Sequence, residues 1–341
     1  MATTRVAVAP MKVAQISKPG GDFEIVEREV PKPGAGEVRI KVDACGVCHS
    51  DQLTKEGLWP GIQYPRIPGH EVAGQIDEAG EGVTAWKMGQ RVGVGWHGGH
   101  CMQCLACRSG QIADCPNSLI TGLTINGGYA EYMLARAEAV IAMPDEFGAA
   151  EAAPLLCAGV TTFGALQRSG AKGGDTVAVH GIGGLGHLAI QFSKKLGFRT
   201  VALSRGRDKE ALSYQMGAHA YVDTSEGKAA AELQKMGGAN SIICTAPNSA
   251  EIAGLVGGLA RGGNLVMVAA PHEPLTIPAF LLLGGSRSIT GWVGGSQSDT
   301  LRFSVRAGIK PMIEEFPLER AAEAYGRMKD AKVRFRSVLK M

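Results

Sequence analysis

The segment Gly46-Val47-Cys48-His49-Ser50-Asp51 offers a thiol, an imidazole, a hydroxyl and a carboxylate within four residues. Thiolate and imidazole are ligands that zinc prefers, so the segment predicts a metal site. His70 and Cys157 are the candidates that complete the ligand set. Two thiolates and one neutral imidazole leave the fourth position of a tetrahedral zinc ion open, as catalytic zinc requires. Cys45 competes with Cys48 as the first thiolate, and the spacing does not decide between them.

Four further cysteines follow the pattern Cys101-x2-Cys104-x2-Cys107-x7-Cys115. Four thiolates at these spacings can fill every position of one tetrahedral zinc ion, which leaves no room for a substrate. We therefore expect a structural zinc that stabilises this loop. The alternatives are an iron–sulfur cluster and unrelated buried cysteines. The spacing argues against a ferredoxin-type cluster, because seven residues instead of three precede the last cysteine and Pro116.

The run Gly181-Ile182-Gly183-Gly184-Leu185-Gly186 has the glycine spacing of a dinucleotide-binding turn. It follows a short apolar, β-branched run and precedes apolar residues at helical spacing. The absent side chains let the backbone reach a pyrophosphate, and the N-terminus of the following helix favours its negative charge. The run therefore predicts that a dinucleotide cofactor binds there.

The elements that must position these residues differ between two parts of the chain. Residues 37–42 alternate between polar and apolar side chains, which predicts a strand that buries Val38, Ile40 and Val42. From Asp175 onwards, strand-like and helix-like patterns alternate strictly, which predicts a doubly wound parallel sheet. Further short strands are expected at residues 72–76, 91–94 and 129–133, and an amphipathic helix at residues 318–328.

A chain of 341 residues is long enough for two hydrophobic cores. We therefore expect an α/β protein with two domains. Residues 1–157 and 291–341 form a β-rich domain, and residues 158–290 form a cofactor-binding domain between them.

The bulk composition excludes some classes of partner. The formal net charge is +3, from 35 basic and 32 acidic residues without a basic tract, so we expect no nucleic-acid or anionic-membrane partner. No apolar run approaches the ~18 residues of a membrane span, and Met1 to Pro10 lacks the long apolar core of a signal peptide. The sequence therefore predicts a cytoplasmic protein.

The pattern Gly69-His70-Glu71-x2-Gly74-x5-Gly80-x2-Val83 resembles the zinc-site signature of the medium-chain, zinc-containing alcohol dehydrogenases. The segment before Asp51, the four-cysteine loop and Leu156-Cys157-Ala158-Gly159-Val160-Thr161 resemble the same family, in its order along the chain. The resemblance implies a GroES-like β-barrel catalytic domain, a Rossmann domain and two zinc ions per chain. Similarity to the shorter yeast and bacterial members implies a homo-oligomer, a tetramer rather than a dimer.

The resemblance also assigns roles around the first zinc. It selects Cys48 over Cys45 as a ligand, makes Asp51 the residue that orients His70, and places Glu71 near the zinc, where it assists ligand exchange. The implied catalytic metal site is thus Cys48, His70, Glu71 and Cys157.

The resemblance also assigns roles in proton transfer and cofactor binding to residues that follow Cys48. Ser50 would accept the proton of a bound alcohol, because a hydroxyl can take and pass on a proton at once. The family's relay usually ends at a histidine, but this chain has Leu53 there, so the last transfer runs through the cofactor ribose or another base. His49 stands where the family places a basic residue against the cofactor pyrophosphate.

The end of the second expected strand bears on cofactor choice. An NAD-binding chain carries an acidic residue about 20 residues after the glycine turn, whereas arginine accommodates the 2′-phosphate of NADP. Here Ser204 stands where NAD-using relatives carry aspartate, and Arg205 and Arg207 follow. Asp208 could serve the ribose hydroxyl instead. NADP(H) is therefore favoured and NAD(H) remains possible.

Six more residues take roles by their position in the family. Thr161 and Leu185 would pack on the nicotinamide, and Arg336 would reach the pyrophosphate. Trp59 and Trp96 match bulky residues that narrow the substrate pocket, with generic core packing as the alternative. Ala270 stands where relatives have a larger residue, which would admit medium-length or aryl alcohols.

The predicted reaction is reversible hydride transfer between a primary or secondary alcohol and NAD(P)+, with a small-molecule alcohol or aldehyde as substrate. A cinnamyl-type aldehyde reductase is the nearest alternative. A non-catalytic zinc-bearing redox-sensing or binding protein is the alternative of another class. A sensor would not need the proton-relay residue Ser50, so its presence beside an intact glycine turn favours an enzyme.

Overall fold

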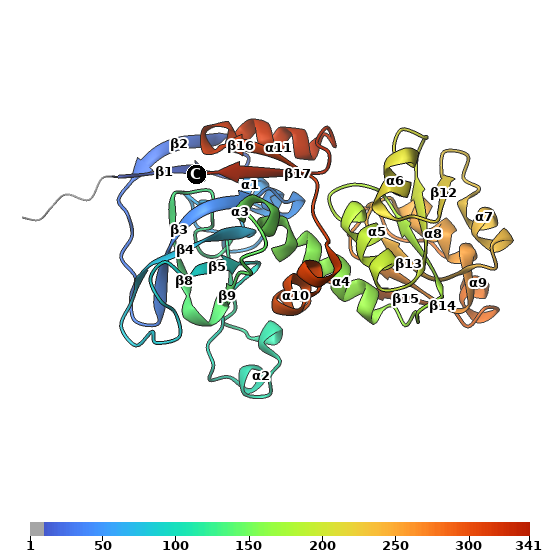
Figure 1. Ribbon diagram of the computed structural model, residues 1–341, viewed down its shortest axis with the longest axis horizontal. Coiled ribbons are helices and arrows are strands. Elements are labelled where there is room, and N and C mark those ends of the chain that lie inside the picture. Colours follow the sequence, from blue (N-terminus) through green and yellow to red (C-terminus); the bar gives the residue numbers. More distant parts are fainter. Residues whose placement is uncertain (1–9) are drawn as a thin grey trace, which may run out of the picture. The chain divides into compact units, whose positions relative to one another are not determined.

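The computed structural model describes residues 10–341. The prediction that the N-terminal segment lacks a signal peptide therefore falls, apart from Pro10, outside the described residues. The described chain forms two compact units. The first contains the residues up to Cys157 together with Met312–Met341, and the second is Ala158–Pro311. Figure 1 labels most of the helices and strands of each unit.

The first unit is built around one largely antiparallel sheet. Among the described residues its strands follow the order β16-β17-β3-β4-β5-β9, and β8 also pairs with β3. Their bounds are β3 Glu37–Gly46, β4 Val72–Ala79, β5 Arg91–Val94, β8 Tyr132–Arg136, β9 Val140–Ala142, β16 Ile313–Pro317 and β17 Arg336–Lys340. Val38, Ile40 and Val42 are buried on β3 while its charged residues are not, which confirms the predicted alternation.

Smaller elements surround this sheet. Strand β1 pairs with β2, and β6 pairs with β7. Helix α11 covers β17, and the Ser337 hydroxyl donates to the Ala324 carbonyl at 3.0 Å. The bounds are β1 Met11–Ile16, β2 Phe23–Arg28, β6 His97–Gly99, β7 Leu119–Ile120, η1 His49–Asp51, α1 Gln52–Glu56, α2 Leu105–Arg108, η2 Ile112–Asp114, η3 Ala137–Ala139, α3 Ala149–Ala152, η4 Ala153–Leu156, η6 Leu318–Arg320 and α11 Ala321–Lys329.

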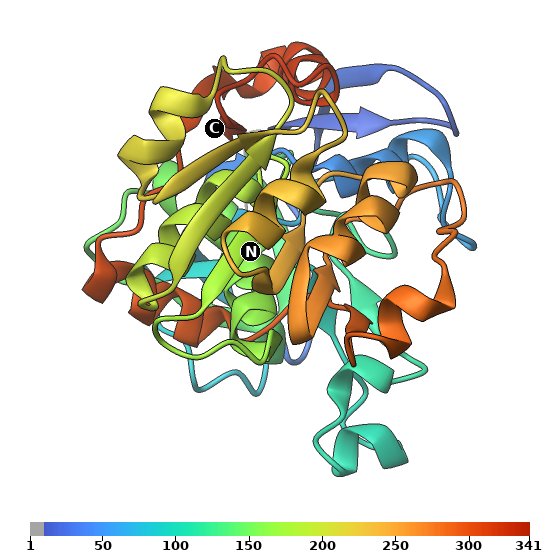
Figure 2. The ribbon, with the colours of Figure 1, turned by 90° about the vertical axis from the view of Figure 1, so that its right-hand side faces the viewer.

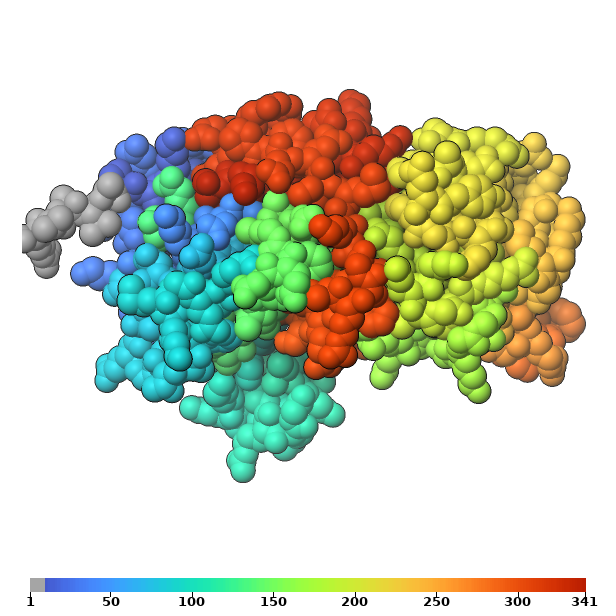
Figure 3. All heavy atoms as spheres, in the orientation of Figure 1, coloured from blue at the N-terminus to red at the C-terminus, as the bar shows by residue number. Residues whose placement is uncertain are grey.

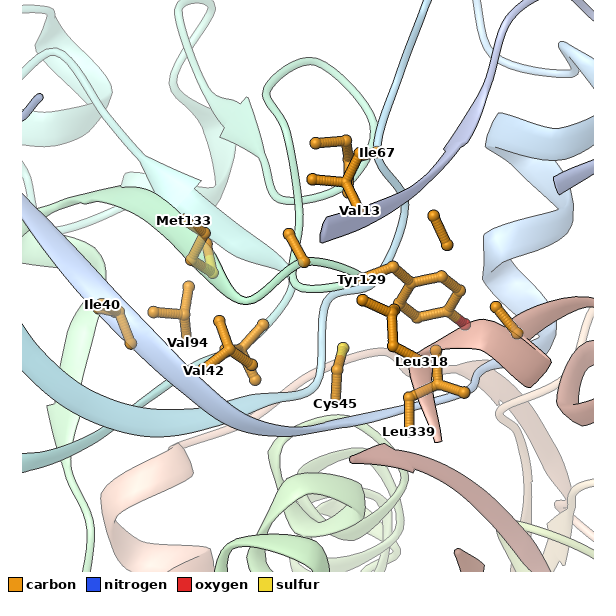
Figure 4. Close-up of a cluster of buried hydrophobic side chains, with 14 of the residues drawn as sticks. Val13, Ile40, Val42, Cys45, Ile67, Val94, Tyr129, Met133, Leu318 and Leu339 are labelled. Atoms are coloured by element: carbon orange, nitrogen blue, oxygen red, sulfur yellow. The ribbon is translucent and has the colours of Figure 1, made fainter. Parts of the chain in front are cut away.

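The core of the first unit lies on the inner face of the sheet. Figure 4 shows Val13, Leu318 and Leu339 near the ring of Tyr129, and Ile40, Val42, Val94 and Met133 grouped further along the same cluster. Cys45 belongs to this cluster and has no exposed surface. Burial of these side chains supplies the main free energy that holds the strands together.

The predicted strand at residues 129–133 is shifted, because β8 begins only at Tyr132. The preceding residues bond to two other segments instead. The Tyr129 amide donates to the Pro68 carbonyl at 3.1 Å, and the Ala14 amide donates to the Tyr129 carbonyl at 2.8 Å. This segment is therefore a bridge between β1 and the loop before β4.

The second unit is a parallel sheet with strand order β12-β11-β10-β13-β14-β15, as its described residues show. Figure 2 looks onto this sheet and its flanking helices. The chain runs outward from β10 on one side and from β13 on the other, so the order reverses between these two strands. The strands are β10 Thr176–His180, β11 Arg199–Ser204, β12 Ala220–Asp223, β13 Ala239–Cys244, β14 Leu259–Met267 and β15 Ser288–Gly291. The helices are α4 Ala158–Arg168, α5 Gly186–Lys195, α6 Glu210–Met216, α7 Ala229–Lys235, α8 Ser249–Leu255, α9 Ala279–Leu283 and α10 Gln297–Ala307, with η5 at Val256–Gly258.

The second unit extends further than the sequence indicated. The predicted return to the first domain was at residue 291, whereas the chain rejoins the first unit at Met312. Helix α10 stays in the second unit because Phe303 stacks on Phe163 of α4, with ring centroids 4.8 Å apart. The short strand β15 was also missed, since its four residues carry little apolar periodicity.

Within residues 10–341, no single helix is long and apolar enough to cross a membrane. The bent pair Ala149–Leu156 and Ala158–Arg168 passes the same criteria when the two helices are taken together, and most of its side chains are buried in the protein.

Candidate functional site

The end of β3 delivers Cys48. Strand β3 pairs with β4 as far as Cys45 and with β17 as far as Gly46, so the chain leaves the sheet at a fixed point. A Cβ on Gly46 would lie 1.9 Å from Oε2 of Glu71, so only glycine lets that carboxylate approach. The Cys48 amide then donates to Oδ2 of Asp51 at 2.9 Å, which holds the first turn of η1.

His70 lies in the loop that enters β4. Its Nδ1 is 3.1 Å from Oδ1 of Asp51, and both side chains are 2% exposed. Its Nε2 is buried and has no hydrogen-bond partner among the described residues. A buried ring nitrogen without a partner is costly, so this atom is directed at a ligand that the polypeptide does not supply. Asp51 fixes the ring so that Nε2 is the nitrogen available for a metal.

Cys157 follows η4, whose buried residues pack against β3, β4 and β5. Its Sγ lies 3.8 Å from Sγ of Cys48. Two thiolates on one tetrahedral zinc ion are separated by roughly the same distance, about 3.8 Å, given Zn–S bonds of about 2.3 Å. Ligand atoms of Cys48, His70, Glu71 and Cys157 all lie within 4.8 Å of one another. The donor set therefore fits a zinc ion.

The two thiols differ in acidity. The adjacent Cys157 thiol lowers the pKa of Cys48 well below its usual value, against the effect of burial and with help from His70 and Arg336. The same contact and burial raise the pKa of Cys157 well above its usual value. The lowered pKa favours the thiolate form of Cys48, which is the form that binds metal.

Glu71 lies beside this cluster with no exposed surface. Burial raises its pKa to about 7, although the Arg336 guanidinium opposes the shift. Nη2 of Arg336 donates to Oε1 of Glu71 and, at 3.0 Å, to the Val47 carbonyl. Arg336 is thus buried in the first unit and bonded to Glu71; its predicted contact with a pyrophosphate remains a prediction.

An aromatic pair stands next to His70. The indole of Trp96 meets the imidazole edge-on, with ring centroids 5.0 Å apart, and Trp59 meets Trp96 in the same way at 6.4 Å. Trp59 is 38% exposed, so it is not an ordinary core residue. Trp96 therefore contacts His70 of the metal cluster, and Trp59 packs on Trp96.

The proton-relay segment lies on η1 and α1. Ser50 is half-buried and His49 is exposed, so their side chains are not part of the hydrophobic core. Leu53 follows in the first turn of α1 and cannot carry a proton.

The four-cysteine loop forms a separate lobe that stands out from the rest of its unit in Figure 3. Its sulfur atoms lie 3.4 to 3.9 Å apart. At the start of helix α2, the Cys104 sulfur accepts a hydrogen bond from the Cys107 amide. Backbone amides of Gln103 and Cys104 lower the pKa of Cys101 to about 6. Leu105 and Met102 are exposed rather than packed, so the lobe has little apolar core. A closed zinc site fits this arrangement.

The glycine turn lies where β10 ends, at the reversal of strand order. Gly181 has φ of 88°, and a Cβ there would lie 2.7 Å from the Ala246 side chain. A Cβ on Gly186, where α5 begins, would lie 1.8 Å from the Gly181 carbonyl oxygen. A Cβ on Gly183, in contrast, would meet nothing within 4 Å, so the backbone is open there to a ligand. Gly184 and Leu185 are half-buried between them. The turn fits a pyrophosphate.

The end of β11 carries the residues predicted to choose the cofactor. Ser204 is buried, whereas the side chains of Arg205 and Arg207 are 75% and 76% exposed. Asp223 at the end of β12 accepts from the Gly206 amide at 2.9 Å and so fixes the loop between the two arginines. Arg205 pairs with Glu251 at 3.8 Å and Arg207 with Glu210 at 2.9 Å, so each exposed guanidinium has a carboxylate partner.

Thr161 is buried on α4, and Ala270 is exposed three residues after β14. The structure tests neither of their predicted roles, which stay predictions.

Family comparisons agree with this geometry. Residues 34–145 match the alcohol dehydrogenase GroES-like domain, and residues 184–306 match the zinc-binding dehydrogenase domain. The chain is 42% identical to alcohol dehydrogenase patD of Penicillium expansum, with 97% of each chain covered. It is 39% identical to an alcohol dehydrogenase of Geobacillus stearothermophilus, covering 97% of this chain and all of that one. The chain belongs to the zinc-containing medium-chain alcohol dehydrogenase family.

Solved structures of this family resemble the chain throughout. A cinnamyl alcohol dehydrogenase from Sorghum bicolor is 30% identical with a TM-score of 0.87, covering 97% of this chain and 98% of that one. CAD from Helicobacter pylori, complexed with NADP(H), is 28% identical with a TM-score of 0.86, covering 98% of each chain. The predicted GroES-like domain and Rossmann domain are confirmed, and the protein is an oxidoreductase that acts on alcohols.

Sequence reasoning missed two residues of this alcohol dehydrogenase. The Tyr129 hydroxyl donates to Oδ2 of Asp51 at 2.8 Å, and burial together with the charge of Asp51 raises its pKa well above the usual value. His180, directly before the glycine turn, bonds through Nε2 to Glu251 at 2.8 Å. In the sequence, the glycine pair before Tyr129 was the only feature that could have marked Tyr129. No sequence pattern marked His180.

Proposed function

We propose that this protein is a zinc-dependent alcohol dehydrogenase that transfers hydride reversibly between a primary or secondary alcohol and NAD(P)+. Its catalytic domain is residues 1–157 with the C-terminal segment, and the Rossmann domain between them binds the cofactor. The observation that carries the proposal is the convergence of Cys48, Cys157 and an unpartnered Nε2 of His70 in one cluster, whose ligand atoms lie within 4.8 Å of one another.

Each chain residue has a defined task in this reaction. When bound, zinc would supply Lewis-acid polarisation of the substrate oxygen, and the nicotinamide would accept the hydride. Cys48, His70 and Cys157 hold the metal, and Asp51 fixes the orientation of His70. Glu71 stays close enough to assist ligand exchange. Ser50 takes the alcohol proton, and His49 faces the cofactor pyrophosphate.

The second zinc belongs to Cys101, Cys104, Cys107 and Cys115, which gives two metal ions per chain. Its role is structural, because four thiolates leave no open position for a substrate. The short distances between the four sulfurs support this assignment.

NADP(H) is the preferred cofactor. Arg205 and Arg207 offer two exposed guanidiniums for a 2′-phosphate, and Ser204 places no carboxylate against it. Their present partners, Glu251 and Glu210, form surface ion pairs that a phosphate can displace at small cost. Thr161 and Leu185 contact the nicotinamide, and Gly181, Gly183, Gly184 and Gly186 with Arg336 serve the pyrophosphate. A higher kcat/KM with NADH than with NADPH would contradict this preference.

In the first unit, Trp59 and Trp96 near His70 would bound the substrate pocket. The role of Ala270 in deepening it rests only on the position of that residue in the family. Medium-length or aryl alcohols fit these residue sizes. The similarity to a sorghum cinnamyl alcohol dehydrogenase supports an aromatic aldehyde reductase as the second candidate. Comparing kcat/KM for cinnamyl and short aliphatic alcohols, in both directions, separates the two.

The protein acts as a homo-oligomer, a tetramer rather than a dimer. In the second unit, β15 is an exposed edge strand, and Phe280, Leu283 and Val293 near it are 77% to 84% exposed. Large exposed apolar side chains beside a free sheet edge favour association. Light scattering measures the mass directly.

The central test is alcohol-dependent reduction of the nicotinamide by metal-replete protein, followed by metal removal and zinc readdition. Activity that survives removal of both metals would contradict the proposed function.

A further inference from the structure

We propose that Tyr129 is a positioning residue for the metal ligand His70 and acts through Asp51. The inference rests on the proposed function, in which His70 binds the catalytic zinc. Three groups form the chain of contacts. The Tyr129 hydroxyl donates to Oδ2 of Asp51 at 2.8 Å, and Oδ1 of the same carboxylate lies 3.1 Å from Nδ1 of His70.

The carboxylate of Asp51 is held from its far side. Oδ2 accepts both from the Tyr129 hydroxyl and, at 2.9 Å, from the Cys48 amide. Two donors on one oxygen fix the plane of the carboxylate, so the other oxygen keeps one direction toward His70. Asp51 is 2% exposed, so water does not replace a lost donor freely. The hydroxyl thus controls how firmly the imidazole is oriented.

Tyr129 is itself held rigidly. Its amide and carbonyl bond to Pro68 and Ala14, and its side chain has no exposed surface. Its ring also packs on Gly69, the residue before His70: a Cβ on Gly69 would lie 2.4 Å from Cδ1 of the ring. The Gly128 amide donates to the Gly69 carbonyl at 3.0 Å. The same segment therefore positions both the backbone and the ring of His70.

These contacts separate two roles of Tyr129. The ring fills the core and shapes the Gly69 backbone, whereas the hydroxyl acts only on Asp51. Tyr129→Phe removes the second role and leaves the first. Tyr325→Phe is the matched control, because Tyr325 is buried in the same cluster and packs on the same Phe23 ring, yet no bond joins it to Asp51.

The experiment measures zinc release from the metal-replete protein into a chromophoric chelator, without substrate or cofactor. Release from the catalytic site should be about tenfold faster in Tyr129→Phe, at the lower end of the effect of residues that support a metal ligand. Release from the four-cysteine lobe should not change, and Cys104→Ser identifies that phase by removing it. Tyr325→Phe should release both metals at the wild-type rates.

A double variant tests whether the hydroxyl acts through Asp51. In the Asp51→Asn background, adding Tyr129→Phe should accelerate release by less than twofold, since the carboxylate is already gone. Full additivity, or an unchanged rate in Tyr129→Phe alone, overturns the inference. If Tyr129→Phe folds poorly, both metals leave faster, and this too contradicts a specific role. A wild-type chain that binds only the lobe metal contradicts the proposed function instead.

Discussion

The two cysteine clusters of the first unit could each bind a zinc ion, but the chain positions their ligands differently. Cys48, His70 and Cys157 come from three separate segments of the chain: Cys48 follows β3, His70 precedes β4 and Cys157 follows η4. Cys48 and His70 are buried, and Cys157 is half-buried. The lobe cysteines come from one short exposed loop and bond mainly to one another and their own backbone. In the proposed zinc sites, the first cluster would leave one ligand position open and has Asp51 to orient His70, whereas four cysteines would leave no position open. A metal site with an open ligand position therefore relies on the surrounding sheet to position its ligands. The proposed four-cysteine site would instead stabilise the loop that supplies its ligands.

His70→Ala breaks the first cluster and should have the largest effect. Loss of a ligand removes the metal and its Lewis acidity, so kcat/KM for alcohol should fall by about 10³-fold or more. Metal analysis should show one equivalent lost and the lobe metal retained. Equal loss of both metals would show that the two clusters are not independent.

Cys104→Ser breaks the second cluster. The lobe has little apolar core, so loss of its metal should cost about 3 kcal/mol and lower the melting temperature by roughly 6–12 °C. Activity at low temperature should persist, because no lobe residue is near His70 in the metal cluster. A calorimetric scan with a parallel assay checks both points, and a large loss of activity at low temperature would contradict the division.

Ser50→Ala keeps both metals and removes only the proton acceptor. We expect kcat for alcohol oxidation to fall by about 10²-fold, a typical contribution of general base catalysis. Metal content and melting temperature should match the wild type. Unchanged turnover would show that another group takes the proton.

Cys45→Ala should have the smallest effect. Cys45 is a fully buried core residue, and burial raises the pKa of its thiol well above the usual value, so it is not a thiolate. Removing one sulfur from the core should cost about 1 kcal/mol, seen as a small shift in denaturant midpoint. Both metals should remain bound, and loss of one would make Cys45 a ligand.

Local patterns were predictable where the interacting residues are neighbours in sequence. The lobe and the glycine turn were found from spacing, because short loops leave few alternatives for four thiolates or for a strand followed by a helix. The return of the chain at Met312 was not predictable, because α10 is amphipathic. Contacts of Phe303 with Phe163 and Phe192 place it in the second unit. Strand β15 was not predicted for a related reason. Its pairing with β14 defines it as a strand, whereas its own residue pattern does not.

By itself, the sequence determined the family, the order of the domains and the chemical types of the ligands, since these depend on residue identity and local spacing. The tertiary structure places Cys48 against Cys157 and Cys45 in the core (Figure 4), in agreement with the ligand that the resemblance selected. Only the tertiary structure showed that Arg336 bonds to Glu71. It also revealed the hydroxyl of Tyr129 behind Asp51. The physical reason is that hydrogen bonds between residues far apart in sequence depend on strand register and side-chain direction. The packing of the whole core sets both.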